Sequence, residues 1–359
     1  MAVRLRTLLL TLLLPLAVLP LLVLPLAGAE QFTLRGLEQP VEILRDRWGV
    51  PHIYAETQHD LFFAQGWITA RDRLFQIDLW RRVNNGRLAE VLGVQALQRD
   101  RMARLVRFRG DWNAEWRAYS PDAKAIATAF TAGINAYIDS LGGKRPLEFR
   151  LAGFDPGKWQ PEDVTGRVAG LLMTRNLARE VGRAVDIQKF GLTQVQKLLP
   201  TVPAMPLVIP KGLDLNLLHN GLLTHFNEAI STVQFPDQPE GNGKRAAVKL
   251  VEPLEERERW GSNNWAVSGA WTATGKPMLA SDPHRPILNP SLRKTVHLVG
   301  PGWNAFGAGE PALPGIALGH NEEIGFGFTI VNIDQGDLYV EKLNETNTDE
   351  YWYKGKLRR

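Results

Sequence analysis

The chain has 359 residues, and its 42 Lys and Arg residues against 38 Asp and Glu residues give a net charge of +4. Because this imbalance is small and the basic residues are scattered, the sequence argues against nucleic-acid binding and favours a small-molecule partner. Cysteine is absent, which excludes disulfides, thiolate nucleophiles and thiolate metal ligands. With 44% hydrophobic residues the chain can bury a large core, in one domain or two.

The first 29 residues have the pattern of a secretory signal peptide. Two arginines precede an apolar run over residues 8–26, and Ala27-Gly28-Ala29 forms a small-residue cleavage site. We therefore expect the mature chain to begin at Glu30 and to be exported to the periplasm or the extracellular space. The alternative is an uncleaved membrane anchor, which three prolines inside the run disfavour. After cleavage no stable membrane span is expected.

Residues 30–199 are predicted to be mostly helical after two short strands. The strands are expected over residues 41–46 and 49–56, around a turn at Arg47-Trp48-Gly49. Apolar residues at helical spacing then predict a helix over residues 57–83, with Thr57 to Asp60 as its cap.

Two more helices are predicted in the same region. The first covers residues 121–141, with Ser120 as cap and Pro121 at its first position, and Gly142-Gly143 ends it. The second runs from Pro161 to about Phe190 and ends at Gly191.

Residues 200–261 differ from what precedes them, because seven prolines, Gly-Asn-Gly and a charged run interrupt the pattern. We interpret this stretch as a linker or removable spacer. The alternative is a long surface loop, although so long a loop without structure is uncommon inside a compact domain.

Residues 262–359 have the composition of short strands separated by Gly, Pro, Asn and Asp. Strands are predicted over residues 265–268, 277–280, 295–299, 316–318, 324–331 and 338–342. Helices first and strands second predict an α+β fold, with helices packed on a mostly antiparallel sheet.

Gly261-Ser262-Asn263-Asn264-Trp265 stands where the proline-rich stretch meets the first of these strands. A serine in such a place is by itself usually a turn residue. Together with the segments from Arg47 to Ile53 and from Gln65 to Gln76, however, this motif resembles the penicillin acylase family of N-terminal nucleophile hydrolases. Gly319-His320-Asn321 and the segment from Asp334 to Glu341 extend the resemblance over nearly the whole mature chain.

The resemblance implies an N-terminal nucleophile hydrolase fold and a precursor that cleaves its own chain between Gly261 and Ser262. The products would be an α chain, a spacer and a β chain that begins at Ser262. Serine needs a base to become nucleophilic, and the freed α-amino group, with a pKa near 8, can serve through water. Glycine before the cut tolerates the strained backbone that the attack requires.

The implied reaction is hydrolysis of the amide bond of an acylated amine, either a β-lactam or another N-acyl compound. The resemblance gives the oxyanion role to the backbone N–H of Ile330, although that group could equally bond within a buried strand. It also puts His284 beside the nucleophile. Acylases of acyl-homoserine lactones typically have His there, so such an acylase is the first alternative, and a catalytically inactive exported protein is the second.

A calcium site and an acyl pocket are also implied. Asp334, the Gly336 carbonyl and Asp337 match the family's calcium ligands, with Glu180 as a further carboxylate, and oxygen ligands suit this cation. Glu180 is alternatively a solvated helix charge. The pocket positions are Met173, Leu177, Arg285 and Leu318. Core packing explains Met173 and Leu177 equally well, and the lack of aromatic residues at three of these positions favours an aliphatic or polar acyl group.

The family's β chain continues well beyond the position that corresponds to Arg359. The resemblance therefore implies that a catalytic asparagine, an arginine near it and further calcium ligands lie outside this sequence. We expect the sequence to be a fragment or a truncated product.

Overall fold

The computed structural model describes residues 30–166, 176–201, 203–230, 233, 235, 261–284, 288–329 and 336–359. The chain divides into a short N-terminal unit, residues 1–35, and a compact unit, residues 36–359. The predicted signal peptide, residues 1–29, lies outside the described residues. Within the described ranges, no helix combines the length and the apolar character that a membrane crossing requires.

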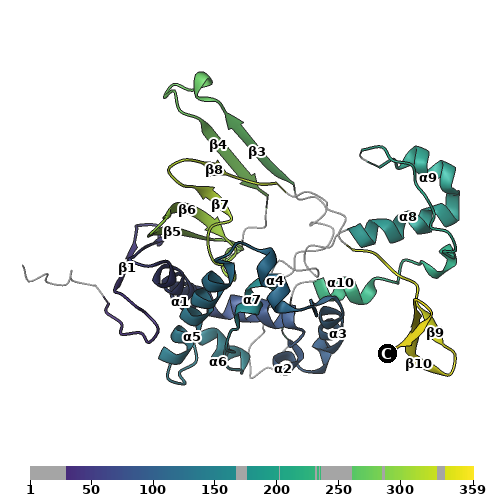
Figure 1. Cartoon of the computed structure of the whole chain (residues 1–359), viewed down its shortest axis with the longest axis horizontal. Coiled ribbons are helices and arrows are strands. Elements are labelled where there is room, and N and C mark those ends of the chain that lie inside the picture. Colours follow the sequence, from purple (N-terminus) through teal and green to yellow (C-terminus); the bar gives the residue numbers. More distant parts are fainter. Residues whose placement is uncertain are drawn as a thin grey trace, which may run out of the picture. The chain divides into compact units, whose positions relative to one another are not determined.

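The main sheet of the compact unit has six strands in the order β1-β2-β5-β6-β7-β8 (Figure 1). Strands β2 and β5 are parallel, and the other neighbours are antiparallel. The prediction of helices combined with a mostly antiparallel sheet is therefore confirmed. The strands are β1 (Val41–Arg45), β2 (Pro51–Ala55), β5 (Lys294–Gly300), β6 (Trp303–Gly309), β7 (Leu318–His320) and β8 (Gly325–Phe326).

Two smaller sheets lie in the C-terminal part of the chain. The first is the antiparallel pair β3 (Ser262–Val267) and β4 (Met278–Pro283), with the 3-10 turn η3 (Gly269–Trp271) after β3. The second has the order β11-β10-β9 and consists of β9 (Lys342–Asn344), β10 (Asn347–Tyr353) and β11 (Lys356–Arg358).

The helices come mainly from the N-terminal half of the chain. They are α1 (Gln58–Asn85), α2 (Ala89–Leu92), α3 (Leu97–Val106), α4 (Trp112–Ala118), α5 (Ala123–Ser140), α6 (Leu147–Ala152), α7 (Pro161–Gly166), α8 (Asn176–Phe190), α9 (Leu192–Leu198) and α10 (Thr224–Ile230), with 3-10 turns η1 (Val94–Ala96) and η2 (Leu215–Leu217). Helix α1 packs against both α5 and the strands β2 and β5. Ile53 and Leu298 of these two strands are completely buried.

Helices α1 and α5 cross in direct backbone contact. A Cβ atom on Gly66 of α1 would lie 2.0 Å from the carbonyl oxygen of Phe130, and one on Gly133 of α5 would lie 1.9 Å from that of Phe63. Real Cβ atoms do not approach backbone oxygens this closely. Glycine at both positions therefore sets the distance between the two helices.

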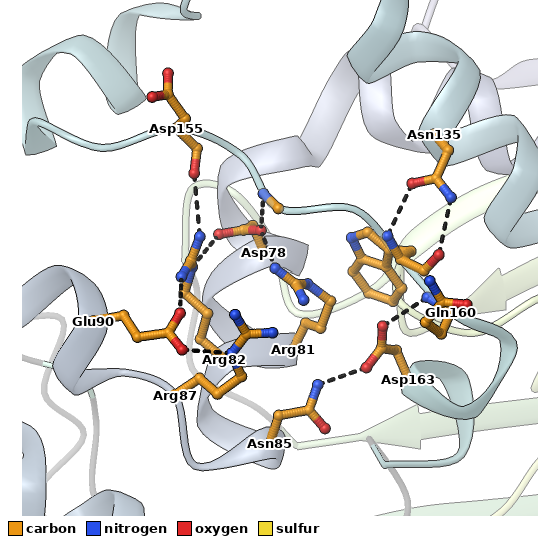
Figure 2. Close-up of polar contacts among 12 residues, drawn as sticks. Asp78, Arg81, Arg82, Asn85, Arg87, Glu90, Asn135, Asp155, Gln160 and Asp163 are labelled. Atoms are coloured by element: carbon orange, nitrogen blue, oxygen red, sulfur yellow. Dashed lines mark hydrogen bonds and ion pairs between the residues drawn. The ribbon is translucent and has the colours of Figure 1, made fainter.

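A buried charge network fixes the second half of α1 (Figure 2). Asp78 is fully buried, and its carboxylate accepts hydrogen bonds from Arg81 Nη2 at 3.0 Å and from Arg82 Nε at 2.7 Å. The N–H of Gly157 also donates to Asp78, at 2.9 Å. Arg82 reaches further, to the carbonyl oxygen of Asp155 and to Glu90. The network ties α1 to the loop between α6 and α7.

Several predicted elements are confirmed. The two N-terminal strands form around their turn, and α1 begins after Thr57, whose hydroxyl accepts a hydrogen bond from Asp60 N at 3.0 Å. Helix α8 ends before Gly191 as predicted, at a residue whose φ of 82° favours glycine. The middle of the helix predicted from Pro161 to Phe190 lies outside the described residues, between α7 and α8.

Other predictions need correction. Helix α5 begins at Ala123, and its cap, Asp122, makes no side-chain capping bond, so Pro121 precedes the helix instead of opening it. No strand covers residues 338–341, whereas β6 was not predicted at all. The spacer over residues 200–261 stays a prediction, although this stretch contains α10, where Phe226 and Ala229 belong to the main hydrophobic core.

The α1–α5 crossing yields a prediction about stability. Replacing Gly133 with Ala forces the two helices apart, and overpacking of this kind costs about 1–3 kcal/mol. We expect urea unfolding of the Gly133→Ala protein to show that loss. The matched control is Gly182→Ala in α8, where a Cβ meets no atom within 4 Å. That variant should gain about 0.5–1 kcal/mol from reduced chain entropy. Equal effects of the two substitutions would contradict the close crossing.

The Asp78 network yields a second prediction. Asp78→Asn leaves two buried guanidinium groups without their carboxylate, and breaking a buried ion pair on one side costs about 3–5 kcal/mol. We expect a correspondingly lower urea midpoint. Asp155→Asn is the matched control, because Asp155 pairs with Arg145 at the exposed surface and such pairs contribute little. A stability of Asp78→Asn close to that of the control would show that the network is not structural.

Candidate active site

The candidate active site is built on the hairpin of β3 and β4. Ser262 is the first residue of β3 and pairs with Pro283, and Asn264 pairs with Ser281. Side chains alternate along a strand, so Ser262 and Asn264 share one face with Ser281. Ser262 and Asn264 are half-buried, whereas Asn263 between them is exposed.

Two hydroxyl groups on this hairpin are buried and unpaired. Neither Ser262 Oγ nor Ser281 Oγ has a hydrogen-bond partner in the described structure. Gly327, just after β8, closes over this face: a Cβ on Gly327 would lie 2.7 Å from both Asn264 Nδ2 and Ser281 Oγ. Buried polar atoms are normally paired, so unpaired hydroxyls at the start of β3 indicate a place where a ligand or reacting group binds.

The peptide between Gly261 and Ser262 is held by His284. The backbone N–H of His284 donates to the carbonyl oxygen of Gly261, with the two atoms 3.2 Å apart. The imidazole lies close to the same residue, because a Cβ on Gly261 would be 3.4 Å from His284 Nδ1. The structure therefore brings Gly261, Ser262 and His284 together, as the sequence predicted.

The imidazole of His284 lies beside two polar groups. Its Nε2 is 3.0 Å from Asp282 Oδ2 and 3.3 Å from Asn263 Nδ2. A carboxylate can only accept, so we assign the Nε2 proton to the bond with Asp282, and Nε2 then does not accept from Asn263. In that tautomer the nitrogen on the Gly261 side is Nδ1, which carries the lone pair. Sequence reasoning missed Asp282, although it stands two residues before His284 in the same motif.

Three further predicted site residues lie outside the described residues: Met173, Arg285 and Ile330. Leu177 is buried in the main hydrophobic core, as the core-packing alternative expects. Leu318 is half-buried at the start of β7, where it pairs with Ala308. Leu318 is not a member of that core cluster.

The predicted calcium ligands are partly brought together. Asn176 Nδ2 lies 2.5 Å from the carbonyl oxygen of Gly336 and 2.7 Å from Glu180 Oε1, so these two oxygens converge on one point. The N–H of Gly336 donates back to Asn176 Oδ1. Asp337 is exposed, and Asp334 lies outside the described residues. Within the described ranges, no cluster of three or more His, Asp or Glu residues has the arrangement of a metal site.

Asn176 was missed by sequence reasoning. Its spacing of four residues from Glu180 on α8 is a signal that could have found it, because residues four apart share a helix face.

Ser291 and Lys294 have the spacing of a Ser-x-x-Lys nucleophile motif, but the structure assigns them other roles. Lys294 Nζ is buried, donates to the carbonyl oxygen of Ile68 at 3.0 Å, and pairs with Asp72 at 2.9 Å. Burial lowers the Lys294 pKa to about 8, against the opposing effect of Asp72. Ser291 is exposed, and its carbonyl oxygen accepts a bond from Arg73 at 3.1 Å. The pair is therefore structural.

Helices packed on a mostly antiparallel sheet place this chain in the α+β class. Its candidate nucleophile, Ser262, opens a strand directly after a glycine. The penicillin amidase family matches residues 40–359, and the chain belongs to that family.

Two curated relatives agree with this assignment, and one solved structure is also similar. The chain is 33% identical to the acyl-homoserine lactone acylase QuiP of Pseudomonas aeruginosa, over 89% of this chain and 36% of that protein. It is 32% identical to the penicillin acylase 2 proenzyme of a Pseudomonas species, over 87% of this chain and 39% of that protein. A chain of the thermostable penicillin G acylase of Alcaligenes faecalis matches with 27% identity and a TM-score of 0.39, over 49% of this chain and 99% of that chain. The chain thus spans less than half the length of the two curated relatives.

Proposed function

We propose that the full-length gene product is an amide hydrolase of the penicillin acylase type, with Ser262 as its nucleophile. The observation that carries the proposal is the geometry at the Gly261–Ser262 peptide. The Ser262 hydroxyl is buried and unpaired, and the carbonyl oxygen one residue earlier accepts a hydrogen bond from the His284 N–H. The family assignment supports the same reaction class.

The first step in this proposal is self-cleavage. Ser262 Oγ attacks the carbonyl carbon of Gly261, and negative charge develops on the Gly261 oxygen, where the His284 N–H already donates. Collapse of this intermediate breaks the peptide C–N bond and leaves an ester between Gly261 and Ser262. The proton from the hydroxyl goes to the expelled nitrogen, which becomes the free α-amino group of Ser262. Water then hydrolyses the ester, which produces a carboxylate on Gly261 and restores the Ser262 hydroxyl.

In turnover, the α-amino group of Ser262 takes the hydroxyl proton through water while Oγ attacks the amide carbonyl of the substrate. The amine leaves with a proton, and water releases the acyl group from Ser262. Asp282 is a positioning residue in this scheme, because its bond to Nε2 fixes the orientation of the His284 ring. The Ile330 N–H, outside the described residues, is the proposed oxyanion donor.

An acyl-homoserine lactone acylase is the second candidate function. His284 favours it, since such acylases typically carry His at this position, and a relative with that name has 33% identity. Leu177 and Leu318 lack the aromatic rings that would favour a phenylacetyl group. An exported protein without activity is the third reading, and measurement of turnover distinguishes it.

We also propose a structural calcium ion, which would stabilise the fold by joining two distant segments. The chemistry of the donors fits a hard cation, because the carboxylate of Glu180 and the carbonyl oxygen of Gly336 both lie beside Asn176 and all three groups offer oxygen atoms. Asp337 and Asp334 would complete the set. Export is proposed from the signal-like pattern of residues 1–29.

The central prediction concerns Ser262. Ser262→Ala should block both self-cleavage and amide hydrolysis, since both steps use the same oxygen. Ser262→Cys should still be cleaved, because a thiol can attack the Gly261 carbonyl, while turnover falls by orders of magnitude. Intact mass and N-terminal sequencing of the full-length gene product follow the cut, and release of amine follows turnover.

Ser268→Ala is the matched control, because Ser268 is an exposed residue that caps η3 just beyond β3. It should leave both steps unchanged. Amide hydrolysis by Ser262→Ala at the parent rate would remove the basis of the proposal.

The calcium proposal has its own test. Protein purified without chelator should contain calcium, and removing the ion should lower the melting temperature, because a ligand that binds only the folded state stabilises it. Glu180→Gln should reduce the calcium content. Asp186→Asn on the same helix is the matched control and should not. Absence of calcium from the untreated protein would argue against the site.

A further inference from the structure

Arg293 lies immediately before β5 and stacks on a residue that neighbours the nucleophile hairpin. Its guanidinium carbon stands 5.2 Å from the centroid of the Phe328 ring, a cation–π arrangement. Phe328 follows Gly327, the residue that closes on Asn264 and Ser281 of the nucleophile hairpin. Gly327 and Phe328 thus link the β3–β4 hairpin to the guanidinium group of Arg293.

The charge of Arg293 is poorly compensated. Its Nε is buried without a hydrogen-bond partner, and among the residues that the structure describes no carboxylate forms an ion pair with it. Burial lowers the pKa of Arg293, and the negative charge of Glu310 opposes this effect. Arginine nevertheless stays protonated in proteins. The side chain is half-buried, so it carries a partly desolvated positive charge that an anion would stabilise.

Two other arginines stacked on rings in this protein have a carboxylate partner. Arg82 lies over Phe154 and Arg81 over Trp159, and both donate to the carboxylate of Asp78. In those cases the protein itself supplies the anion. At Arg293 the aromatic support is present, but the described chain does not supply the carboxylate. The stacked guanidinium presents planar donors that match a carboxylate.

We propose that Arg293, supported by Phe328, is a binding subsite for a carboxylate group of the amide substrate. The inference rests on the proposed function and narrows it to substrates that carry a negative charge near the scissile amide. A β-lactam nucleus or another N-acyl compound with a free carboxylate meets this condition. A neutral acyl-homoserine lactone does not.

The test compares substrates that differ in one charge. N-hexanoyl-homoserine lactone and its ring-opened acid differ by one water molecule and place the carboxylate on the amine side. Pentanoyl- and glutaryl-p-nitroanilide place it on the acyl side. We expect kcat/KM of the full-length gene product to be higher for at least one of the two acids than for its neutral partner.

Arg293→Gln should lower kcat/KM for that acid about 10- to 100-fold, as expected for loss of a charge-assisted bond, and change the neutral substrate less than about twofold. Arg293→Lys should be intermediate, since it keeps the charge without the planar donors. The matched control is Arg47→Gln, because Arg47 is also stacked on a ring, Trp48, at 5.0 Å, but on the β1–β2 turn. It should affect acids and neutral substrates equally.

The outcomes separate the two proposals. Hydrolysis of neutral and acidic amides with equal sensitivity to Arg293→Gln overturns the subsite and leaves the proposed function intact. If no amide is hydrolysed, the proposed function fails, and glutarate binding measured by calorimetry tests the subsite alone. Salt-sensitive binding to the parent protein that is lost in folded Arg293→Gln supports it. Equal binding by both proteins, or no binding by either, overturns it.

Discussion

The close crossing of α1 and α5, at Gly66 and Gly133, is the constraint on which the rest of this structure depends. Where two backbones touch, neither helix can shift without breaking the contact, so α5 fixes the position of α1. Helix α1 in turn holds the second half of the chain. Gln65 bonds to both backbone groups of Gly315, at 3.0 Å and 2.9 Å. Further along, Gln76 donates to the carbonyl oxygen of Ser291 at 3.1 Å.

Buried charges make this attachment specific. Asp72 of α1 accepts from Lys294 at the start of β5 and from Arg45 of β1, so one carboxylate joins a helix to two strands. A displaced helix would leave Lys294 buried and unpaired, which is costly. Six residues further on, Asp78 joins the same helix to a loop on its other side. Apolar packing alone would allow α1 to shift slightly, whereas the ion pairs and hydrogen bonds of Asp72 and Asp78 prevent such a shift.

The sequence predicted the elements whose signals are local. Thr57 and Gly191 mark helix ends by their own chemistry, so α1 and α8 were found. Strand β6 was missed because Asn304 to Gly309 is rich in Gly and Ala, and it forms a strand only because β5 and β7 pair with it. Helix α10 was missed because prolines surround it, whereas burial of Phe226 in the core decides its structure.

The same distinction applies to the site. Ser262 and His284 stand in a recognisable motif, so sequence alone was enough to propose them as site residues. Asn176 acts through Gly336, which is 160 residues away. Arg293 is proposed as a binding residue because it stacks on Phe328, and this contact forms only in the folded chain. Residues that act through distant partners carry no local signal, which is why sequence reasoning did not find them.

The parallel pairing of β2 with β5 has a consequence for how the two proposed products are related. His52, Ile53 and Tyr54 pair with residues 297–299, so one ladder joins strands from opposite sides of Ser262. A cut there would turn an internal ladder into a subunit interface with the density of a domain core. Such halves would form an obligate heterodimer, with no separately folded state from which to reassemble. The uncut chain would therefore have to fold before it is cleaved at Ser262. Its fold would then determine how the two cleavage products are assembled.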